Sequence, residues 1–305
     1  MRPQGLKRFF RFVEIETKPA TVIPALLALS YVFYATGSIN AVSMAVYFVA
    51  AFFLDMSITA VNNHFDKREG KQEPHYGNVT SVCIILGMLS VFAVLGAYLA
   101  YEHGFTVLVA GALCFLVGIC YTYGPAPISK SPYGEAVSGF MAGIVLMFIV
   151  VSINDRSFDP LGLQMDFSTW RLALDVDLAR LATFVLLSLP PTFCTANITF
   201  ANNICDHERD RPYRYTLVHS LGVGRSLKLF CGLYVASYMA VAVSVMIESV
   251  PLWCLLVFVT VPYVNKNVRA FFAEQQKNST FLLAIKNFVV ITLTYTLGFV
   301  LGAVI

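Results

Sequence analysis

The stretch AVSMAVYFVAAFFLDMSITAVNNHFDKREG, residues 41–70, joins the two features that decide the fold of this chain. Its part from 41 to 63 is mostly apolar and long enough to cross a bilayer as a helix. At Asn62 a polar stretch begins with Asn-Asn and places Asp66 four residues after its first Asn. A second apolar run ends in NNICDHERDRPYRYT, residues 202–216, which also begins with Asn-Asn and places Asp206 four residues after its first Asn. Carboxylates beside membrane helices are costly to place. We therefore interpret both polar stretches as functional and as two parts of one site.

The composition extends this pattern to the whole chain. Of its 305 residues, 57% are hydrophobic and only 13% are charged, whereas a soluble domain carries about a quarter charged residues. Apolar stretches of about 20 residues recur along the sequence, which is typical of a polytopic membrane protein. An isolated strand would leave unpaired backbone groups in lipid. We therefore expect an all-α membrane protein.

We predict one membrane domain covering residues 1–305, with nine transmembrane helices. The predicted spans are 20–36, 41–63, 79–101, 104–123, 134–154, 178–203, 225–247, 250–271 and 281–303. The two Asn-Asn stretches close the second and the sixth of these spans, an offset of four helices that suggests an internal pseudo-repeat.

Lys and Arg residues predict the orientation of these spans. One side of the predicted membrane receives the N-terminal arm, both Asn-Asn stretches and most basic loop residues, whereas the other side receives only Arg156, Arg171 and Arg180. We therefore expect a cytoplasmic N-terminus. The basic arm with its Phe residues is either an interfacial helix or a positive-inside anchor. In the long external loop from 154 to 178 we expect a short interfacial helix at 166–174.

Helical spacing places the polar residues of each motif on one face. Asp55, Thr59, Asn62 and Asp66 follow one another by three or four residues, and the second motif repeats this pattern. The members of the second pattern are Thr199, Asn202 or Asn203, Asp206 and Asp210. If the two faces meet, their carboxylates cannot all stay ionised without a cation. Mg²⁺ suits carboxylate and amide oxygens and is usually completed by phosphate oxygens. The site therefore predicts a Mg²⁺–diphosphate ligand.

Basic residues follow each motif and suit the same ligand. They can neutralise diphosphate oxygens, and they are Lys67, Arg68 and Lys71 after the first motif and Arg209, Arg211 and Arg214 after the second. The alternative for each base is an ordinary positive-inside loop charge, and for the aspartates a solvated loop carboxylate.

A third polar segment, YTYGPAPISKSPYGEAVSG at 121–139, links the fourth and fifth spans on the same side. Tyr121 and Tyr123 can offer ring faces to a cation, and Lys130 adds a positive charge. Glu135 is either a functional carboxylate or a favourable charge at a helix N-terminus. Asp55, deeper in its span, either binds an acceptor substrate or pairs with a neighbour.

Together these segments resemble the UbiA superfamily of intramembrane aromatic prenyltransferases. The chain looks most like the 1,4-dihydroxy-2-naphthoate polyprenyltransferases of menaquinone synthesis. The resemblance covers essentially the whole chain. It includes VEIETKPATVIPALLA at 13–28 with its matching Lys18, both Asn-Asn motifs and the tyrosine-glycine-proline segment. One departure is that Asn63 stands where the superfamily's first motif usually has Asp.

The resemblance implies a UbiA-type helix bundle in the cell membrane, with an active site open to the cytoplasm. It implies Mg²⁺-dependent transfer of a polyprenyl group to 1,4-dihydroxy-2-naphthoate, with decarboxylation to demethylmenaquinol. The implied metal ligands are Asp66, Asn62, Asp206, Asp210 and Asn202. The implied catalytic residues are Asp66, Asp206, Asp210, Lys67, Arg68, Tyr121 and Arg214. The remaining binding residues are Asn62, Asn63, Asn202, Asn203, Lys18 and Lys130.

Other functions fit the sequence less well. A transporter would place acids near the bilayer midplane, but here only Asp55 lies well inside a span. The DGxxAR signature of CDP-alcohol phosphotransferases is absent from the sequence. A UbiA-type enzyme with another acceptor, such as 4-hydroxybenzoate or homogentisate, stays open. We expect prenyl diphosphate, an aromatic acceptor and the lipid bilayer as partners, with no nucleic acid and no obligate protein partner.

Overall fold

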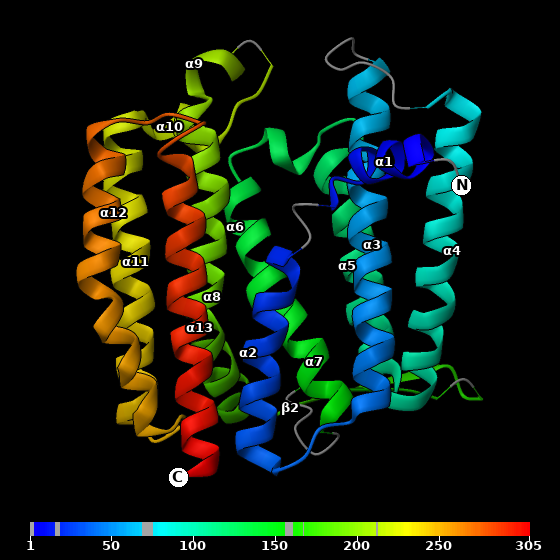
Figure 1. Ribbon diagram of the computed structural model, residues 1–305. Coiled ribbons are helices and arrows are strands. Elements are labelled where there is room, and N and C mark those ends of the chain that lie inside the picture. Colours follow the sequence, from blue (N-terminus) through cyan, green and yellow to red (C-terminus); the bar gives the residue numbers. More distant parts are fainter. Residues whose placement is uncertain (1–2, 16–18, 69–75, 156–160, 167, 212) are drawn as a thin grey trace. The chain divides into compact units, whose positions relative to one another are not determined.

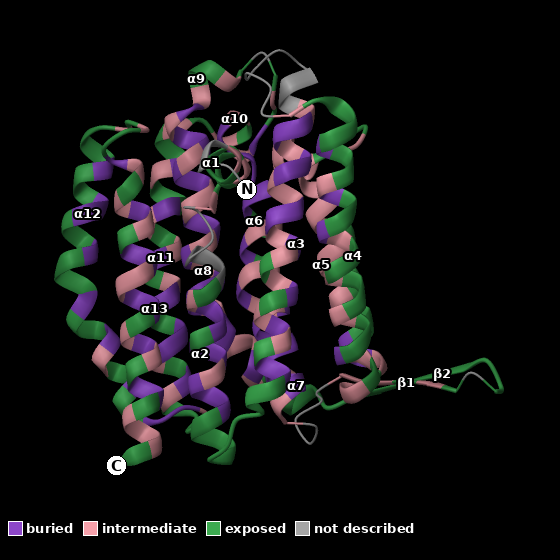
Figure 2. Ribbon diagram, turned by 45° about the vertical axis from the view of Figure 1, so that its right-hand side comes forward, coloured by how far each residue is buried: buried purple, intermediate pink, exposed green. Residues whose placement is uncertain are grey.

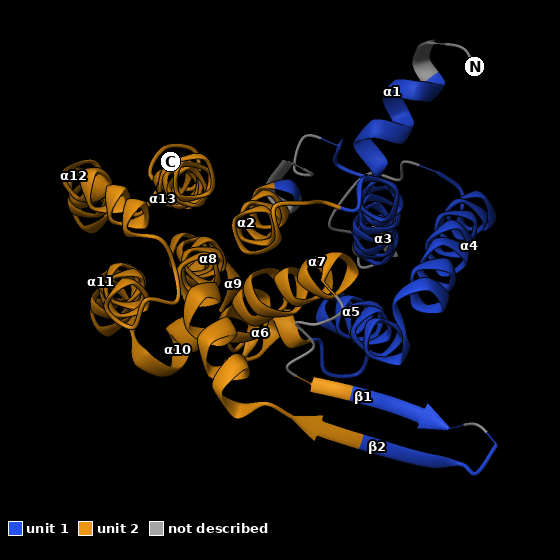
Figure 3. Ribbon diagram, turned by 90° about the horizontal axis from the view of Figure 1, so that it is seen from below, with its two compact units in different colours: residues 1–22, 40–127, 163–173 blue, residues 23–39, 128–162, 174–305 orange. Residues whose placement is uncertain are grey.

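The computed structural model describes residues 3–15, 19–68, 76–155, 161–166, 168–211 and 213–305. Most of these residues form helices, as predicted (Figure 1). The chain divides into two compact units (Figure 3). Unit 1 comprises residues 1–22, 40–127 and 163–173, and unit 2 comprises residues 23–39, 128–162 and 174–305. The expectation of one membrane domain stays a prediction.

Unit 1 is built from helices that pack around α3. Its helices are α1 (Pro3–Phe12), α3 (Ala41–Arg68), α4 (Asn78–His103) and α5 (Phe105–Thr122). Phe12 of α1, Met56 and Ala60 of α3, and Ile85 and Met88 of α4 form one buried apolar cluster. Most of the surface of α4 is exposed in Figure 2, and its exposed residues include Val82, Leu86 and Val94. An apolar face of this kind suits contact with lipid.

Unit 2 contains most of α2 (Pro19–Thr36) and the helices that come after residue 127. They are η2 (Ile128–Lys130), α6 (Gly134–Gly139), η3 (Phe140–Val145), α7 (Leu146–Asn154), α8 (Leu178–Cys205), α9 (His207–Asp210), α10 (Leu217–Leu221), α11 (Val223–Met246), η5 (Leu252–Thr260), α12 (Val261–Ala273) and α13 (Phe281–Val304). The long helix α8 packs against α6, η3, α11 and α13. Because both the loop after α8 and the start of α6 carry candidate site residues, α8 is the element that positions the site.

Two glycines allow the helix of α6 and η3 to approach α8 closely. A Cβ atom added to Gly139 would lie 2.6 Å from the carbonyl oxygen of Thr192, and one added to Gly143 would lie 2.5 Å from the Cα atom of Thr192. Such close backbone contacts are typical of helices that pack through small residues in membranes. The contact follows Pro190 and Pro191 inside α8. It coincides with η3, where the helix widens into a π-helical turn.

Amides and hydroxyls are buried among the helices of unit 2. Asn267 of α12 donates from Nδ2 to Oδ1 of Asn287 in α13 at 2.7 Å. Asn197 of α8 donates from Nδ2 to the carbonyl oxygen of Phe230 in α11 at 3.0 Å. All three asparagines are at most 6% exposed. Polar groups this deeply buried contribute to packing only when they are hydrogen-bonded, so one bond joins α12 to α13 and the other joins α8 to α11.

The predicted interfacial helix at 166–174 is wrong. The segment is a hairpin of β1 (Leu161–Asp166) and β2 (Arg171–Val176). Leu172, Leu174 and Val176 alternate with other residues, which is the period of a strand and not of a helix. The Asp166 carboxylate accepts hydrogen bonds from the hydroxyls of Ser168 and Thr169, each at 2.6 Å. These bonds close the turn and hold the pKa of the Asp166 carboxyl below its usual range.

Within the described residues, seven helices are long and apolar enough to cross a membrane. They are Ala41–Phe65, Asn78–His103, Phe105–Thr122, Gly134–Asn154, Leu178–Cys205, Val223–Met246 and Phe281–Val304. Their ends agree with seven of the predicted spans to within two residues. The other two predicted spans correspond to α2, whose apolar helix is shorter, and to η5 with α12, where the helix type changes at Val261. The count of nine spans and the orientation stay predictions.

Candidate active site

The second polar motif lies where α8 ends and the chain continues into the single turn of α9. The backbone N–H of Asp206 donates to the carbonyl oxygen of Asn202 at 3.1 Å, and that of Asp210 donates to Asp206 at 2.8 Å. The N–H of Arg214 donates to Asp210 at 2.9 Å. Each bond joins residues four apart, so the spacing of Asn202, Asp206, Asp210 and Arg214 is kept beyond the end of α8.

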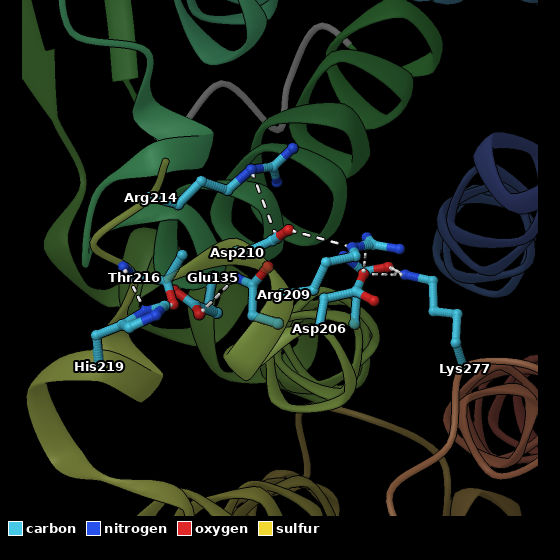
Figure 4. A network of polar contacts seen from close by, with 10 residues as sticks. Glu135, Asp206, Arg209, Asp210, Arg214, Thr216, His219 and Lys277 are labelled. Atoms are coloured by element: carbon cyan, nitrogen blue, oxygen red, sulfur yellow. Dashed lines mark hydrogen bonds and ion pairs between the residues drawn. The ribbon is translucent and has the colours of Figure 1, made fainter. Parts of the chain in front are cut away.

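Asp206 is a buried carboxylate with two basic partners (Figure 4). Its Oδ2 atom accepts a hydrogen bond from Lys277 Nζ at 2.7 Å and lies 3.1 Å from Nη2 of Arg209. The same Lys277 ammonium donates to Oδ1 of Asn202. The Asp206 side chain is only 7% exposed, whereas that of Lys277 is 38% exposed. The oxygens of Asn202 and Asp206 therefore converge on one cation.

Asp210 is paired with two arginines. Its Oδ1 atom lies 3.5 Å from Nε of Arg209, and its Oδ2 atom lies 3.6 Å from Nε of Arg214. Arg209 thus bridges the two aspartates (Figure 4). Counted together, Asp206 and Asp210 carry two negative charges, and Arg209, Arg214 and Lys277 carry three positive ones. The excess of positive charge favours an anionic ligand such as a phosphate group.

In each Asn-Asn pair, the second asparagine is buried in packing. Asn203 donates from Nδ2 to Oε1 of Glu135, in the first turn of α6, at 2.8 Å. In unit 1, Asn63 donates to the carbonyl oxygen of Phe12 at 3.0 Å and to Oε1 of Glu14 at 3.2 Å. Asn63 and Asn203 are 3% and 4% exposed. These contacts give both residues a structural role, and their predicted role in binding stays a prediction.

The first asparagine of each pair is half-buried, as are Asp55 and Thr59 on the polar face of α3. The Thr59 hydroxyl donates to the backbone carbonyl of Asp55 at 3.1 Å. Helix α3 continues to Arg68, so Asp66, Lys67 and Arg68 lie in its last turn. Their side chains lie outside the described residues, and so does the whole of Lys18. The metal and diphosphate roles of these residues, and the meeting of the two motifs, stay predictions.

In each unit, a part of the tyrosine-glycine-proline segment contacts the polar motif of that unit. In unit 1, Tyr121 lies half-buried near the end of α5, and the Tyr123 ring stacks on Phe65 with 3.9 Å between centroids. Phe65 directly precedes Asp66. In unit 2, the backbone carbonyl of Lys130 accepts a hydrogen bond from the Tyr215 N–H at 3.0 Å, one residue beyond Arg214. This segment is therefore held beside each motif by contacts within each unit.

The donor set of the second motif fits Mg²⁺. No cluster of three or more His, Cys, Asp or Glu side chains suited to a metal is present among the residues that the structure describes. The motif instead offers the Asp206 carboxylate and the Asn202 amide oxygen, which already converge on the Lys277 ammonium. Mg²⁺ commonly binds one or two carboxylates and completes its shell with water and substrate phosphates. The Asp206 carboxylate and the Asn202 amide oxygen therefore need phosphate oxygens from a bound substrate to hold Mg²⁺ firmly.

Residues 21–290 match the sequence model of the UbiA prenyltransferase family. The chain belongs to the UbiA prenyltransferase family. A curated relative is the 1,4-dihydroxy-2-naphthoate octaprenyltransferase of Bacillus subtilis (strain 168), 24% identical over 209 residues. The match covers 68% of this chain and 60% of that protein, so the chain spans about three fifths of its relative's length. The predicted family is thereby confirmed.

Solved structures confirm the fold of this UbiA family chain. A structure of digeranylgeranylglyceryl phosphate synthase has a TM-score of 0.67 at 15% identity and covers 99% of both chains. A UbiA homologue from Archaeoglobus fulgidus, bound to DMAPP and Mg²⁺, has a TM-score of 0.62 at 12% identity. That match covers 98% of this chain and 100% of the other. A UbiA homologue from Aeropyrum pernix K1 has a TM-score of 0.64 at 13% identity, with coverages of 90% and 96%.

Lys277 is the site residue that sequence reasoning missed. In the sequence it is one of the basic loop residues on the predicted cytoplasmic side, 71 residues from Asp206 and outside every motif. The one available signal was its position just before the last apolar span, on the same predicted side as both Asn-Asn stretches. Only the packing of α13 against α8 reveals the contact.

Proposed function

We propose that this protein transfers the polyprenyl group of a polyprenyl diphosphate to 1,4-dihydroxy-2-naphthoate, with loss of the carboxylate, to give demethylmenaquinol. The convergence of Asn202, Asp206 and three bases at the end of α8 is the observation that carries the diphosphate part of the proposal. The acceptor is supported by the name of the Bacillus subtilis relative. The metal is supported by the Archaeoglobus fulgidus homologue bound to DMAPP and Mg²⁺.

In this proposal the residues of the second motif bind and orient the diphosphate. Asn202, Asp206 and Asp210 would hold Mg²⁺, with Asn62 and Asp66 as further ligands from the first motif. Bound Mg²⁺ would act as a Lewis acid that stabilises the charge of the departing diphosphate. Arg214, Lys67 and Arg68 would donate to the remaining diphosphate oxygens.

The other residues would guide the organic part of the reaction. The Tyr121 ring would face the allylic carbon as positive charge develops there. Lys18, Lys130, Asn63 and Asn203 complete the proposed binding residues. The apolar helices would exclude water, so that the aromatic ring of the acceptor and not water attacks.

The proposed setting is the cell membrane, with nine spans, a cytoplasmic N-terminus and an active site open to the cytoplasm. It is supported by the seven apolar helices and by the placement of Lys and Arg in the sequence. A polyprenyl tail is itself membrane-soluble, which suits a site at the end of membrane helices.

The test is product analysis with parallel acceptors. Purified protein is incubated with Mg²⁺, a long polyprenyl diphosphate and either 1,4-dihydroxy-2-naphthoate, 4-hydroxybenzoate, homogentisate or glycerol 1-phosphate, and products are identified by mass. We expect a prenylated, decarboxylated product with the naphthoate. Product formed only with another acceptor would replace the proposed acceptor, and no product with any acceptor would refute prenyl transfer.

A further inference from the structure

Lys277 reaches the second motif from a different part of the chain. It lies between α12 and α13, whereas its partners Asn202 and Asp206 lie at the end of α8. Figure 4 shows Lys277 extending toward Asp206. Its ammonium contacts one oxygen of each partner. An ordinary surface pair such as Arg180 with Asp177 joins neighbours on one helix, and both of those side chains are about half exposed. Lys277 instead neutralises a carboxylate that is 7% exposed.

The turn that carries Lys277 is closed by its own hydrogen bonds. The backbone N–H of Gln276 donates to the Thr280 hydroxyl at 2.8 Å. The N–H groups of Thr280 and Phe281 both donate to the Gln276 carbonyl at 3.0 Å. The Lys277 ammonium also lies 4.9 Å from the centroid of the Phe281 ring. The hydrogen bonds of this turn and the Phe281 ring therefore place the Lys277 ammonium beside Asp206.

Two of the atoms that Lys277 contacts are atoms proposed to bind the metal. Asn202 Oδ1 and Asp206 Oδ2 cannot give the same lone pairs to an ammonium and to Mg²⁺, so the two cations compete. A Lys side chain has a long flexible stem and three donors that can be redirected. Its half-exposed state leaves room for that movement. Diphosphate oxygens carry negative charge, whereas the Asn202 amide oxygen that Lys277 would leave is neutral. The diphosphate oxygens are therefore the stronger hydrogen-bond acceptors.

We propose that Lys277 is a displaceable internal cation of this site, an inference that rests on the proposed function. Before substrate binds, its ammonium holds Asn202 and Asp206 together and offsets the charge of the buried carboxylate. When a divalent cation binds with diphosphate, Lys277 leaves these two oxygens and donates to the diphosphate. The residue thus couples metal binding to diphosphate binding, so that metal alone binds weakly.

The experiment measures binding and not turnover. The full chain in lipid nanodiscs is titrated with Mn²⁺ alone, and bound Mn²⁺ is followed by electron paramagnetic resonance. A pair between a part-exposed ammonium and a carboxylate is worth about a factor of five in affinity. We therefore expect the Lys277→Met variant to bind Mn²⁺ about fivefold more tightly than the native protein. With Mn²⁺ saturating, we expect inorganic diphosphate to bind about fivefold more weakly to Lys277→Met.

Two variants control for charge and for folding. Lys266→Met removes an equal charge from the exposed surface of α12 and should leave both affinities within about twofold of the native values. Lys277→Arg keeps the charge and should shift both affinities less than Lys277→Met does. Equal Mn²⁺ affinity of native protein and Lys277→Met would overturn this inference but leave the proposed function standing. Absence of Mn²⁺ and diphosphate binding in both proteins would overturn the metal site of the proposed function as well.

Discussion

Replacing Asn203 by Leu tests whether the two asparagines of the second motif have separate roles. Asn203 donates to Oε1 of Glu135 at 2.8 Å, and both side chains are at most 4% exposed. The second carboxyl oxygen of Glu135 has no hydrogen-bond partner among the described residues. Leu has a similar volume but no donor, so the substitution removes the side-chain donor that the described residues supply to the buried Glu135 carboxyl.

The expected cost follows from that contact. A buried polar group that loses its partner destabilises a protein by about 1–3 kcal/mol, and a carboxyl group belongs at the upper end of this range. We expect Asn203→Leu to lower the free energy of unfolding by about 3 kcal/mol. For a chain of 305 residues that corresponds to a fall in Tm of about 5 °C. The double variant Asn203→Leu with Glu135→Leu removes both partners and should recover most of the loss.

The assay is thermal unfolding of the purified variants in one detergent, followed by tryptophan fluorescence and circular dichroism. The matched control is Asn202→Leu, one residue away and half-buried, which should keep Tm within about 2 °C but weaken Mn²⁺ binding. A native Tm for Asn203→Leu would refute the structural role of that residue. A double variant whose loss equals the sum of the single losses would show that Asn203 and Glu135 do not interact.

Three further predictions concern unit 2 and the site. Gly143→Val places a side chain against the Thr192 backbone and should destabilise the protein by about 1–3 kcal/mol, measured as a lower Tm. The exposed-site control Gly232→Val has no atom within 4 Å of its added Cβ and should cost less. Asn267→Leu leaves Oδ1 of Asn287 without its donor and should cost about 1–2 kcal/mol; an unchanged Tm would contradict this. Arg214→Gln, which removes a partner of Asp210, should weaken inorganic diphosphate binding about fivefold with little change in Tm, and unchanged binding would contradict the assigned role.

The sequence was sufficient for the helical class and for the family because its signals are local. Apolar runs of about 20 residues and four Asn residues in two pairs can be recognised without any tertiary contact. The same local reasoning failed at residues 166–174, where Leu172 and Leu174 were expected in a helix although the apolar residues of RLALDV, residues 171–176, have a period of two. A short apolar segment does not distinguish a helix from a strand well. Here the hydrogen bonds of Asp166 in the hairpin turn favour the strands.

The site was predictable only as far as its motifs extend. Asp206, Asp210 and Arg214 share one stretch of chain, and their spacing places them together. Asn203 and Asn202 look equivalent in the sequence, yet packing of α6 against α8 turns Asn203 toward Glu135. Lys277 enters the site because α13 packs against α8, and a contact across 71 residues leaves no spacing pattern.

The assignment of the end of α8 as the metal–diphosphate site of a prenyltransferase is the most important part of the proposed function. Its most direct test compares native protein with Asp206→Asn in nanodiscs containing Mg²⁺, a long polyprenyl diphosphate and 1,4-dihydroxy-2-naphthoate, with product measured by mass spectrometry and folding by Tm. Because Asn keeps the shape of Asp206 but removes the charge that binds the metal, we predict a loss of turnover of about 100-fold or more, with a Tm close to the native value. Native turnover by Asp206→Asn would contradict this assignment.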